Sequence, residues 1–128
     1  MRLAKTIIVI EDEPDILELL LELLQNEGFE VYGCENGKKG YNFIRSRISE
    51  NLPVDLVVTD VNMPLKGGVE LTRDLRALEL KIPIVLLSGE TNDEIEILKK
   101  TPGVSGVERK PFKWEQLISN LNEYLEKS

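Results

Sequence analysis

Short apolar runs alternate along this chain with longer segments in which apolar residues recur every three or four positions. Runs of the first kind are typical of β-strands, and the helical spacing of the second kind is typical of amphipathic helices. Strand-like runs are predicted at residues 5–10, 29–32, 55–59, 83–87 and 104–108. Because a helix-like stretch follows each run, the pattern indicates βαβ units and a parallel sheet.

The helix-like stretches have recognisable starts and one apolar face each. The first is expected to begin at Pro14 and to stop before Gly28, since proline suits the first helical position and glycine the end. The fourth opens with a capping-box pattern from Thr91 to Glu94, and the last begins near Trp114. The apolar positions expected to face the core are Ile16, Leu17, Leu20, Leu23, Leu24, Tyr41, Ile44, Ile48, Leu71, Leu75, Leu78, Ile95, Leu98, Leu117, Ile118, Leu121 and Leu125.

The five strand-like runs differ in kind, which predicts their order in the sheet. Residues 7–10, 56–58 and 84–87 are continuously apolar, as expected of strands covered on both faces. Residues 29–32 alternate, and glycines interrupt residues 103–107, which suits edge strands. The second and fifth strands are therefore expected at the edges. The predicted fold class is an α/β doubly wound parallel sheet with strand order 2-1-3-4-5.

Length and charge narrow the classes of function. With 128 residues the chain is expected to form a single domain, 1–128, and 41% hydrophobic with 30% charged residues is a globular composition. The formal charge of −7 repels a phosphate backbone, so direct nucleic-acid binding is not expected. The sequence contains no signal-peptide pattern and no long apolar stretch. We therefore expect a soluble, cytoplasmic protein that does not enter a membrane.

Cysteine and histidine usage excludes several chemistries. Cys34 has no second cysteine with which to form an internal disulfide, and we expect it to be a small apolar residue at a strand end. The chain contains no histidine. Catalysis by Ser-His-Asp or Cys-His, histidine metal sites and a phosphohistidine on this chain are therefore excluded. Carboxylates, hydroxyls and lysines remain as candidate functional groups.

Polar residues follow four of the predicted strands at the point where each ends. Glu11 and Asp12 follow the first, Asp60 the third, Ser88 the fourth and Lys110 the fifth. The carboxyl ends of parallel strands meet at one edge, where open α/β sheets bind ligands. Clustered carboxylates repel one another unless a cation neutralises them, and Mg²⁺ takes oxygen ligands from carboxylates and from a substrate phosphate. The sequence therefore predicts a site for magnesium and a phosphoryl group, with Asp60 as a possible nucleophile.

These motifs together resemble a known family. Glu11-Asp12, Asp60, Ser88 and Lys110-Pro111-Phe112, in this order, are similar to the motifs of the response-regulator receiver domain of two-component signalling. Each motif alone is weak, whereas all four in order are specific. The resemblance covers essentially the whole chain and implies a flavodoxin-like (βα)5 fold in a stand-alone receiver with no output domain.

The resemblance also implies a magnesium site. Asp12 would ligate Mg²⁺ directly and Glu11 through water. Asp60 would be a further ligand, and Asn62 would offer its backbone carbonyl to the metal.

The resemblance further implies that Asp60 accepts a phosphoryl group from the phosphohistidine of a histidine kinase or from a phosphotransfer protein. Ser88 and Lys110 would hold the phosphoryl oxygens, and the Lys110–Pro111 bond would be cis. Asn62 and Glu90 match variable positions that flank the pocket and tune dephosphorylation in the family. The resulting signal would be a change of partner, with an unknown downstream protein. The fourth helix, fifth strand and fifth helix would form the output surface.

Two positions depart from the family pattern. Val107 stands where the family usually has an aromatic residue that rotates together with the hydroxyl residue, and an isopropyl group cannot make that movement. Gly67-Gly68 stands where Asp-Gly is common. Val107 motivates an alternative, a receiver-like docking module that works without phosphorylation. A third hypothesis, a flavodoxin-like protein that binds a flavin phosphate, is disfavoured by the acidic loop at residues 11–15, which would repel the phosphate.

Simpler interpretations exist for single residues. Asp60 alone could be a capping or turn carboxylate, and Ser88 a turn residue. Glu13 and Asp15 are expected to be solvated acids near a helix N-terminus. Trp114, together with Phe112, is expected to pack at the last helix.

Overall fold

The computed structural model describes residues 4–127, in which five strands alternate with five helices. Their order is β1 (Thr6–Ile10), α1 (Pro14–Asn26), β2 (Glu30–Cys34), α2 (Gly37–Ser49), β3 (Leu56–Asp60), α3 (Gly68–Ala77), β4 (Ile84–Ser88), α4 (Asn92–Lys99), β5 (Gly106–Arg109) and α5 (Trp114–Lys127). The expected starts of the first and last helices are confirmed. The predicted capping box is present as well, because the Thr91 side chain and Glu94 exchange hydrogen bonds with each other's backbone.

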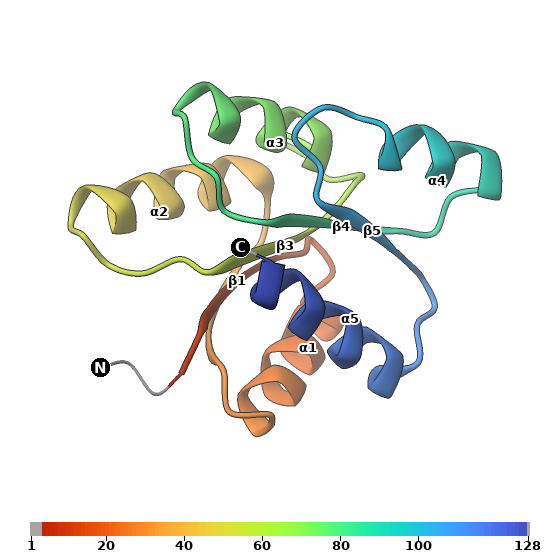
Figure 1. Cartoon of the computed structure of the whole chain (residues 1–128), viewed down its shortest axis with the longest axis horizontal. Helices are drawn as coiled ribbons and strands as arrows, with labels where there is room; N and C mark the ends of the chain where they lie inside the picture. The colour runs from red at the N-terminus through yellow and green to blue at the C-terminus, as the bar shows by residue number, and fades with distance from the viewer. Residues whose placement is uncertain (1–3, 128) are drawn as a thin grey trace.

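All strand pairs are parallel, and the order across the sheet is β2-β1-β3-β4-β5, as predicted. Helices α1 and α5 cover one face of the sheet, and α2, α3 and α4 cover the other (Figure 1). The register pairs Ile10 with Thr59, Asp60 with Leu87, and Ser88 with Arg109. The carboxyl ends of β1, β3, β4 and β5 therefore lie side by side at one edge.

The core consists of two apolar layers, one on each face of the sheet. Because side chains alternate along a strand, Ile8 and Ile10 enter the layer under α2, α3 and α4, while Ile7 and Val9 enter the layer under α1 and α5. These side chains of β1 are fully buried, as predicted for a central strand. Cys34 is buried at the end of β2, as expected of a small apolar residue.

Three details differ from the prediction. Strand β2 continues through Cys34, two residues beyond the predicted run. Strand β5 begins only at Gly106, because Val104 belongs to a turn in which its N–H donates to the carbonyl of Thr101. Leu78, expected in the core, is 41% exposed because α3 ends at the preceding residue and the chain turns there.

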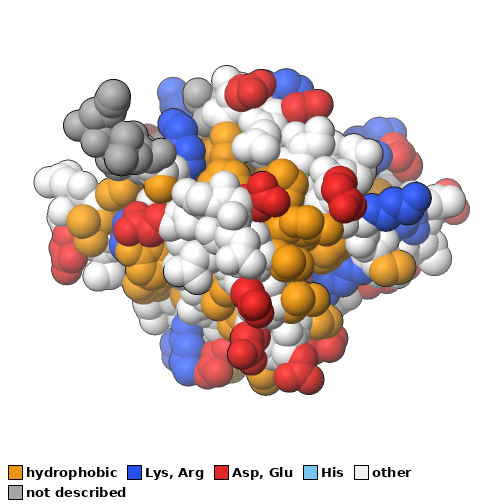
Figure 2. Space-filling view, turned by 90° about the horizontal axis from the view of Figure 1, so that it is seen from below, with side chains coloured by type: hydrophobic (Ala, Val, Ile, Leu, Met, Phe, Trp, Pro, Cys, Tyr) orange, Lys and Arg blue, Asp and Glu red, His pale blue; other side chains and the backbone are white. Residues whose placement is uncertain are grey.

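Seen from the side of α1 and α5, the surface shows apolar side chains between scattered carboxylates (Figure 2). Leu17 and Leu21 of α1 border a shallow hollow together with Glu18 and Glu22. Among the described residues, no helix is both long enough and apolar enough to cross a membrane.

Candidate functional site

Three carboxylates meet where β1 and β3 end. Glu11 and Asp12 directly follow β1, and Asp60 is the last residue of β3. Each of the three offers a carboxylate oxygen, and these oxygens lie within 4.8 Å of one another. Glu11 is fully buried, and its N–H donates to the carbonyl of Cys34, which continues the β1–β2 ladder and fixes its position. The parallel register thus brings together residues that are far apart in the sequence.

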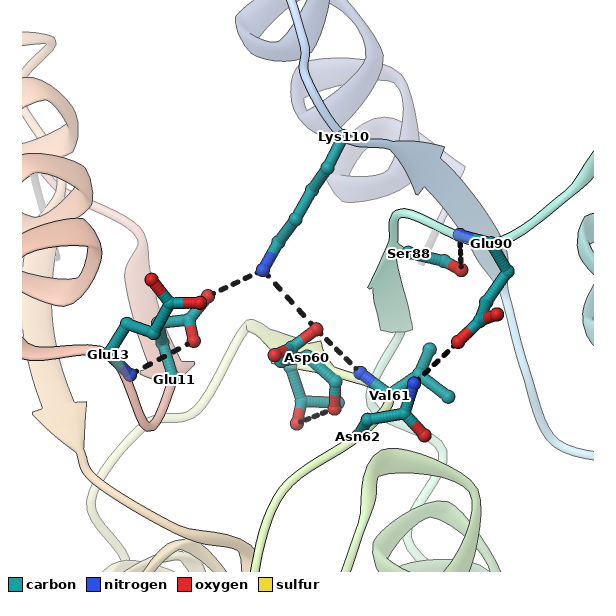
Figure 3. A network of polar contacts seen from close by, with 9 residues as sticks. Glu11, Glu13, Asp60, Val61, Asn62, Ser88, Glu90 and Lys110 are labelled. Atoms are coloured by element: carbon teal, nitrogen blue, oxygen red, sulfur yellow. Dashed lines mark hydrogen bonds and ion pairs between the residues drawn. The ribbon is translucent and has the colours of Figure 1, made fainter.

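Lys110 reaches between two of these acids (Figure 3). Its Nζ lies 2.8 Å from Oε1 of Glu11 and 3.3 Å from Oδ1 of Asp60. Lys110 follows β5, and its N–H donates to the carbonyl of Ser88 at 2.8 Å, so the main chain fixes where the side chain starts. The Lys110–Pro111 bond is cis, as the resemblance implied.

The electrostatics of this cluster leave an excess of negative charge. Burial raises the pKa of Asp60, and the nearby Lys110 ammonium only partly opposes this effect. Burial also raises the pKa of Glu11, against the hydrogen bond from Lys110. For Lys110 itself, burial disfavours the charged form, but the hydrogen bond to Glu11 and the charge of Asp60 outweigh it and raise the pKa. Lys110 therefore contacts two of the three clustered acids, Glu11 and Asp60.

Ser88 lies beside the cluster but its hydroxyl is directed elsewhere. The residue is 1% exposed, and its Oγ accepts a hydrogen bond from the N–H of Glu90 at 3.1 Å. In Figure 3 the hydroxyl points toward the Glu90 backbone rather than toward Asp60. Because a hydroxyl can donate while it accepts, Ser88 keeps a donor for a group bound next to Asp60.

Asn62 and Glu90 face each other near the cluster. The side-chain amide of Asn62 donates to Oε1 of Glu90 at 2.5 Å (Figure 3). This bond connects the loop after β3 with the loop after β4. The Asn62 side-chain amide thus points toward Glu90, and the backbone carbonyl of this residue stays the candidate metal ligand that the resemblance implies.

The loop from Asp60 to α3 is held in an unusual backbone conformation. Leu65 and Lys66 both have positive φ angles, 53° and 88°, which non-glycine residues rarely adopt. The carbonyl of Leu65 accepts the N–H of Lys38 at 2.8 Å, and the Lys66 ammonium contacts Asp74. Such conformations persist only where the surroundings enforce them, and they are common at functional sites.

The residues at this edge fit a hard divalent cation. Mg²⁺ prefers carboxylate oxygens and retains water ligands, and Glu11, Asp12 and Asp60 present a matching set of oxygens. A cation here would also offset the repulsion among three acids that one lysine neutralises only in part.

Sequence reasoning missed one residue beside the site. Arg109 donates from Nη1 to the carbonyl of Glu90 at 3.4 Å and from Nη2 to Oδ1 of Asn92. Arg109 ends β5 and directly precedes Lys110, and this position in the sequence could have pointed to a role near the site. Val107, by contrast, is buried against the core on the α4 side and makes no polar contact of this kind.

Comparison with known proteins agrees with this geometry. The sequence profile of the response regulator receiver domain matches residues 7–122. The chain belongs to this family. Magnesium binding and phosphorylation are typical of these receiver domains of two-component systems.

Two solved receiver structures and one sequence relative illustrate the similarity. A response regulator receiver domain from Clostridium thermocellum has a TM-score of 0.83 at 26% identity, covering 96% of this chain and 95% of that one. TrrA from Thermotoga maritima, solved in complex with Mg²⁺-BeF, has a TM-score of 0.80 at 29% identity, covering 94% and 98%. The response regulator GtcR of Aneurinibacillus migulanus is 31% identical over 126 residues, 98% of this chain. The chain spans about half the length of the curated relatives it matches.

Proposed function

We propose that this receiver accepts a phosphoryl group on Asp60 in a magnesium-dependent reaction and signals through changed protein–protein interaction. The observation that carries the proposal is the cluster of Glu11, Asp12 and Asp60, whose carboxylate oxygens lie within 4.8 Å, with the Lys110 ammonium against it. A phosphoryl acceptor needs a carboxylate nucleophile and positive charge for the incoming oxygens. Family membership supports the same reaction.

The reaction consists of two transfers. A carboxylate oxygen of Asp60 attacks phosphorus, the bond from phosphorus to the donor histidine nitrogen breaks, and that nitrogen keeps the electron pair. The product is an acyl phosphate. Water later attacks phosphorus, the bond to the Asp60 oxygen breaks, and inorganic phosphate leaves while the carboxylate is restored.

Each residue of the site has a role in this proposal. Glu11, Asp12, Asp60 and the backbone carbonyl of Asn62 would hold Mg²⁺, which would neutralise charge on the phosphoryl oxygens. Lys110 would bind one phosphoryl oxygen. Its contacts with Glu11 and Asp60 already keep the ammonium at the nucleophile. The Ser88 hydroxyl would donate to another oxygen.

The partners follow from this chemistry. The proposed donor is a phosphohistidine on a histidine kinase or on a phosphotransfer protein, the partners with which receiver domains of this family interact. The output is a downstream protein that distinguishes phosphorylated from unphosphorylated receiver.

Intact-mass spectrometry after incubation with acetyl phosphate tests the acceptor. We expect the gain of one phosphoryl group in the presence of Mg²⁺, little gain with a chelator, and no gain in Asp60→Asn. Asp15→Asn is the matched control, since it removes an exposed carboxylate of the same acidic segment and should leave the reaction unchanged. No phosphoryl gain in folded, magnesium-binding protein would contradict the proposal and favour a docking module that works without phosphorylation.

A further inference from the structure

Helix α4 is weakly anchored to the rest of the domain. Ile95 is its only buried residue, and Ile97 on the same helix is 68% exposed. An element with little buried apolar surface is held mainly by its ends and opens at low cost. The contacts at the N-terminal end of α4 therefore decide where the preceding loop, residues 89–91, is placed.

Arg109 supplies a contact of this kind from the neighbouring strand. It is the last residue of β5 and lies opposite Ser88 in the parallel register. Side chains two residues apart share one face of a strand, so Arg109 projects on the α4 side, as Val107 does. Its guanidinium donates to the carbonyl of Glu90, at 3.4 Å, and to the side chain of Asn92.

The segment that Arg109 holds is the one that orients the pocket. Glu90 donates its N–H to Oγ of Ser88 at 3.1 Å and accepts the Asn62 amide on its carboxylate at 2.5 Å. The bond to Ser88 starts from the Glu90 backbone, so it depends directly on where that backbone lies. Arg109 contacts that backbone through the Glu90 carbonyl, and it contacts the first residue of α4, Asn92, as well.

We propose that Arg109 is a positioning residue for the phosphoryl site, acting through the loop between β4 and α4. Its guanidinium keeps the Glu90 backbone and Asn92 in place, and with them the Glu90 N–H that orients the Ser88 hydroxyl beside the cluster. The inference rests on the proposed function for its effect on phosphorylation. The contact of Arg109 with Glu90 and Asn92 can itself be tested without phosphorylation.

The first measurement is the rate of phosphorylation by acetyl phosphate, followed by intact mass over a range of Mg²⁺ concentrations. Arg109→Ala is expected to lower the rate at saturating Mg²⁺ by about threefold to tenfold, the range that corresponds to the net contribution of one ordinary hydrogen bond. The Mg²⁺ concentration that gives half the maximal rate should stay within about twofold of wild type. General damage to the pocket would change both quantities.

Variants separate geometry from charge. Arg109→Lys keeps the charge but not the forked pair of donors, and it should fall between wild type and Arg109→Ala. Lys113→Ala removes an exposed positive charge four residues away and should leave the rate unchanged. Asn92→Ala should slow the reaction less than Arg109→Ala, and the double variant should be no slower than Arg109→Ala alone.

Hydrogen–deuterium exchange of the unphosphorylated protein measures directly how firmly Arg109 holds the loop between β4 and α4. Arg109→Ala should increase exchange at residues 89–95 and leave the strand β1 unchanged. Unchanged exchange in this segment overturns the proposal even if wild type is phosphorylated. A rate for Arg109→Ala within about twofold of wild type, or multiplicative effects of Arg109→Ala and Asn92→Ala, overturns it as well. If wild type accepts no phosphoryl group, the proposed function fails, and the exchange data still decide whether Arg109 holds the loop.

Discussion

Lys110 neutralises only part of the negative charge around it. Its ammonium contacts Glu11 and Asp60, and burial raises the pKa of both acids despite these contacts. A buried ion pair loses stability when one partner is removed, because the other charge is left uncompensated. The lysine therefore has a structural role in the metal-free domain in addition to its role toward phosphoryl oxygens.

Lys110→Met is expected to lower the free energy of unfolding of the metal-free protein by about 1–3 kcal/mol, below the cost for a fully buried pair, since the Lys110 side chain is 21% exposed. The loss should be smaller in an Asp60→Asn background, where one of the two facing carboxylates is already neutral. Urea unfolding at neutral pH with a chelator measures both values. Lys113→Met, at an exposed lysine, is the control. Equal losses in the two backgrounds would show that Lys110 and Asp60 are not coupled.

The sequence predicted which side chains meet at this edge, but not how each is oriented. Asp60 ends a strand, and Glu11 and Lys110 each directly follow one, and a parallel sheet places such positions together whatever the side chains. The direction of the Ser88 hydroxyl depends instead on the Glu90 backbone, which lies in the loop between β4 and α4. The contacts of Arg109 depend on where α4 begins relative to β5, and the spacing of apolar residues along the sequence does not predict that distance.

The start of α2 and the loop after β3 are packed against each other through a glycine. A Cβ on Gly37 would lie 1.8 Å from the carbonyl oxygen of Lys66, a backbone atom that cannot move alone. The adjacent Lys38 N–H holds the same loop through Leu65. Since this loop leads from Asp60 to α3, the contact fixes the position of the phosphoryl site relative to α2.

Gly37→Ala should therefore destabilise the domain by about 1–3 kcal/mol, the usual cost of overpacking, and should also slow phosphorylation of Asp60. Gly89→Ala is the matched control, because a Cβ there meets no atom within 4 Å although the residue is next to Ser88. Thermal unfolding and the acetyl phosphate reaction measure the two effects. A Gly37→Ala protein as stable and as reactive as Gly89→Ala would show that the loop adjusts freely.

Element types, order and strand pairing were predictable because they depend on patterns within short segments. Proline at the start of α1 and the capping box of α4 gave boundaries that the structure confirms. The start of β5 was wrong, since the strand-like residue Val104 is used in a turn closed by Thr101. Local propensity could not reveal that choice, because it is decided by how far β5 extends beside β4.

Two carboxylates of the acidic cluster make the stability of the whole domain depend on pH and on magnesium. Asp60 has a folded pKa above its ordinary value of 3.8, and Glu11 has one above 4.5, so the folded state binds these protons more tightly than the unfolded state does. Stability then falls as pH rises through the window between the ordinary and the folded values. Above this window both carboxylates are charged in the folded protein, and the free energy of unfolding is lowered by the full cost of burying the two charges.

In a chelator, Asp60→Asn should accordingly be more stable than wild type at neutral pH, and the difference should shrink as pH falls toward 3.8. In the presence of Mg²⁺, wild type should instead be more stable than Asp60→Asn. A ligand that binds only the folded state adds RT ln(1 + [L]/Kd), about 2.7 kcal/mol at 100 times its Kd, and Asp60→Asn has lost one of the three carboxylates that would bind it. Urea unfolding at several pH values, with chelator and with Mg²⁺, measures the four combinations. Asp15→Asn, at an exposed acid, should follow wild type throughout. If Mg²⁺ stabilised Asp60→Asn as much as wild type, the bound ion would lie away from Asp60, and the acidic cluster would not be its site.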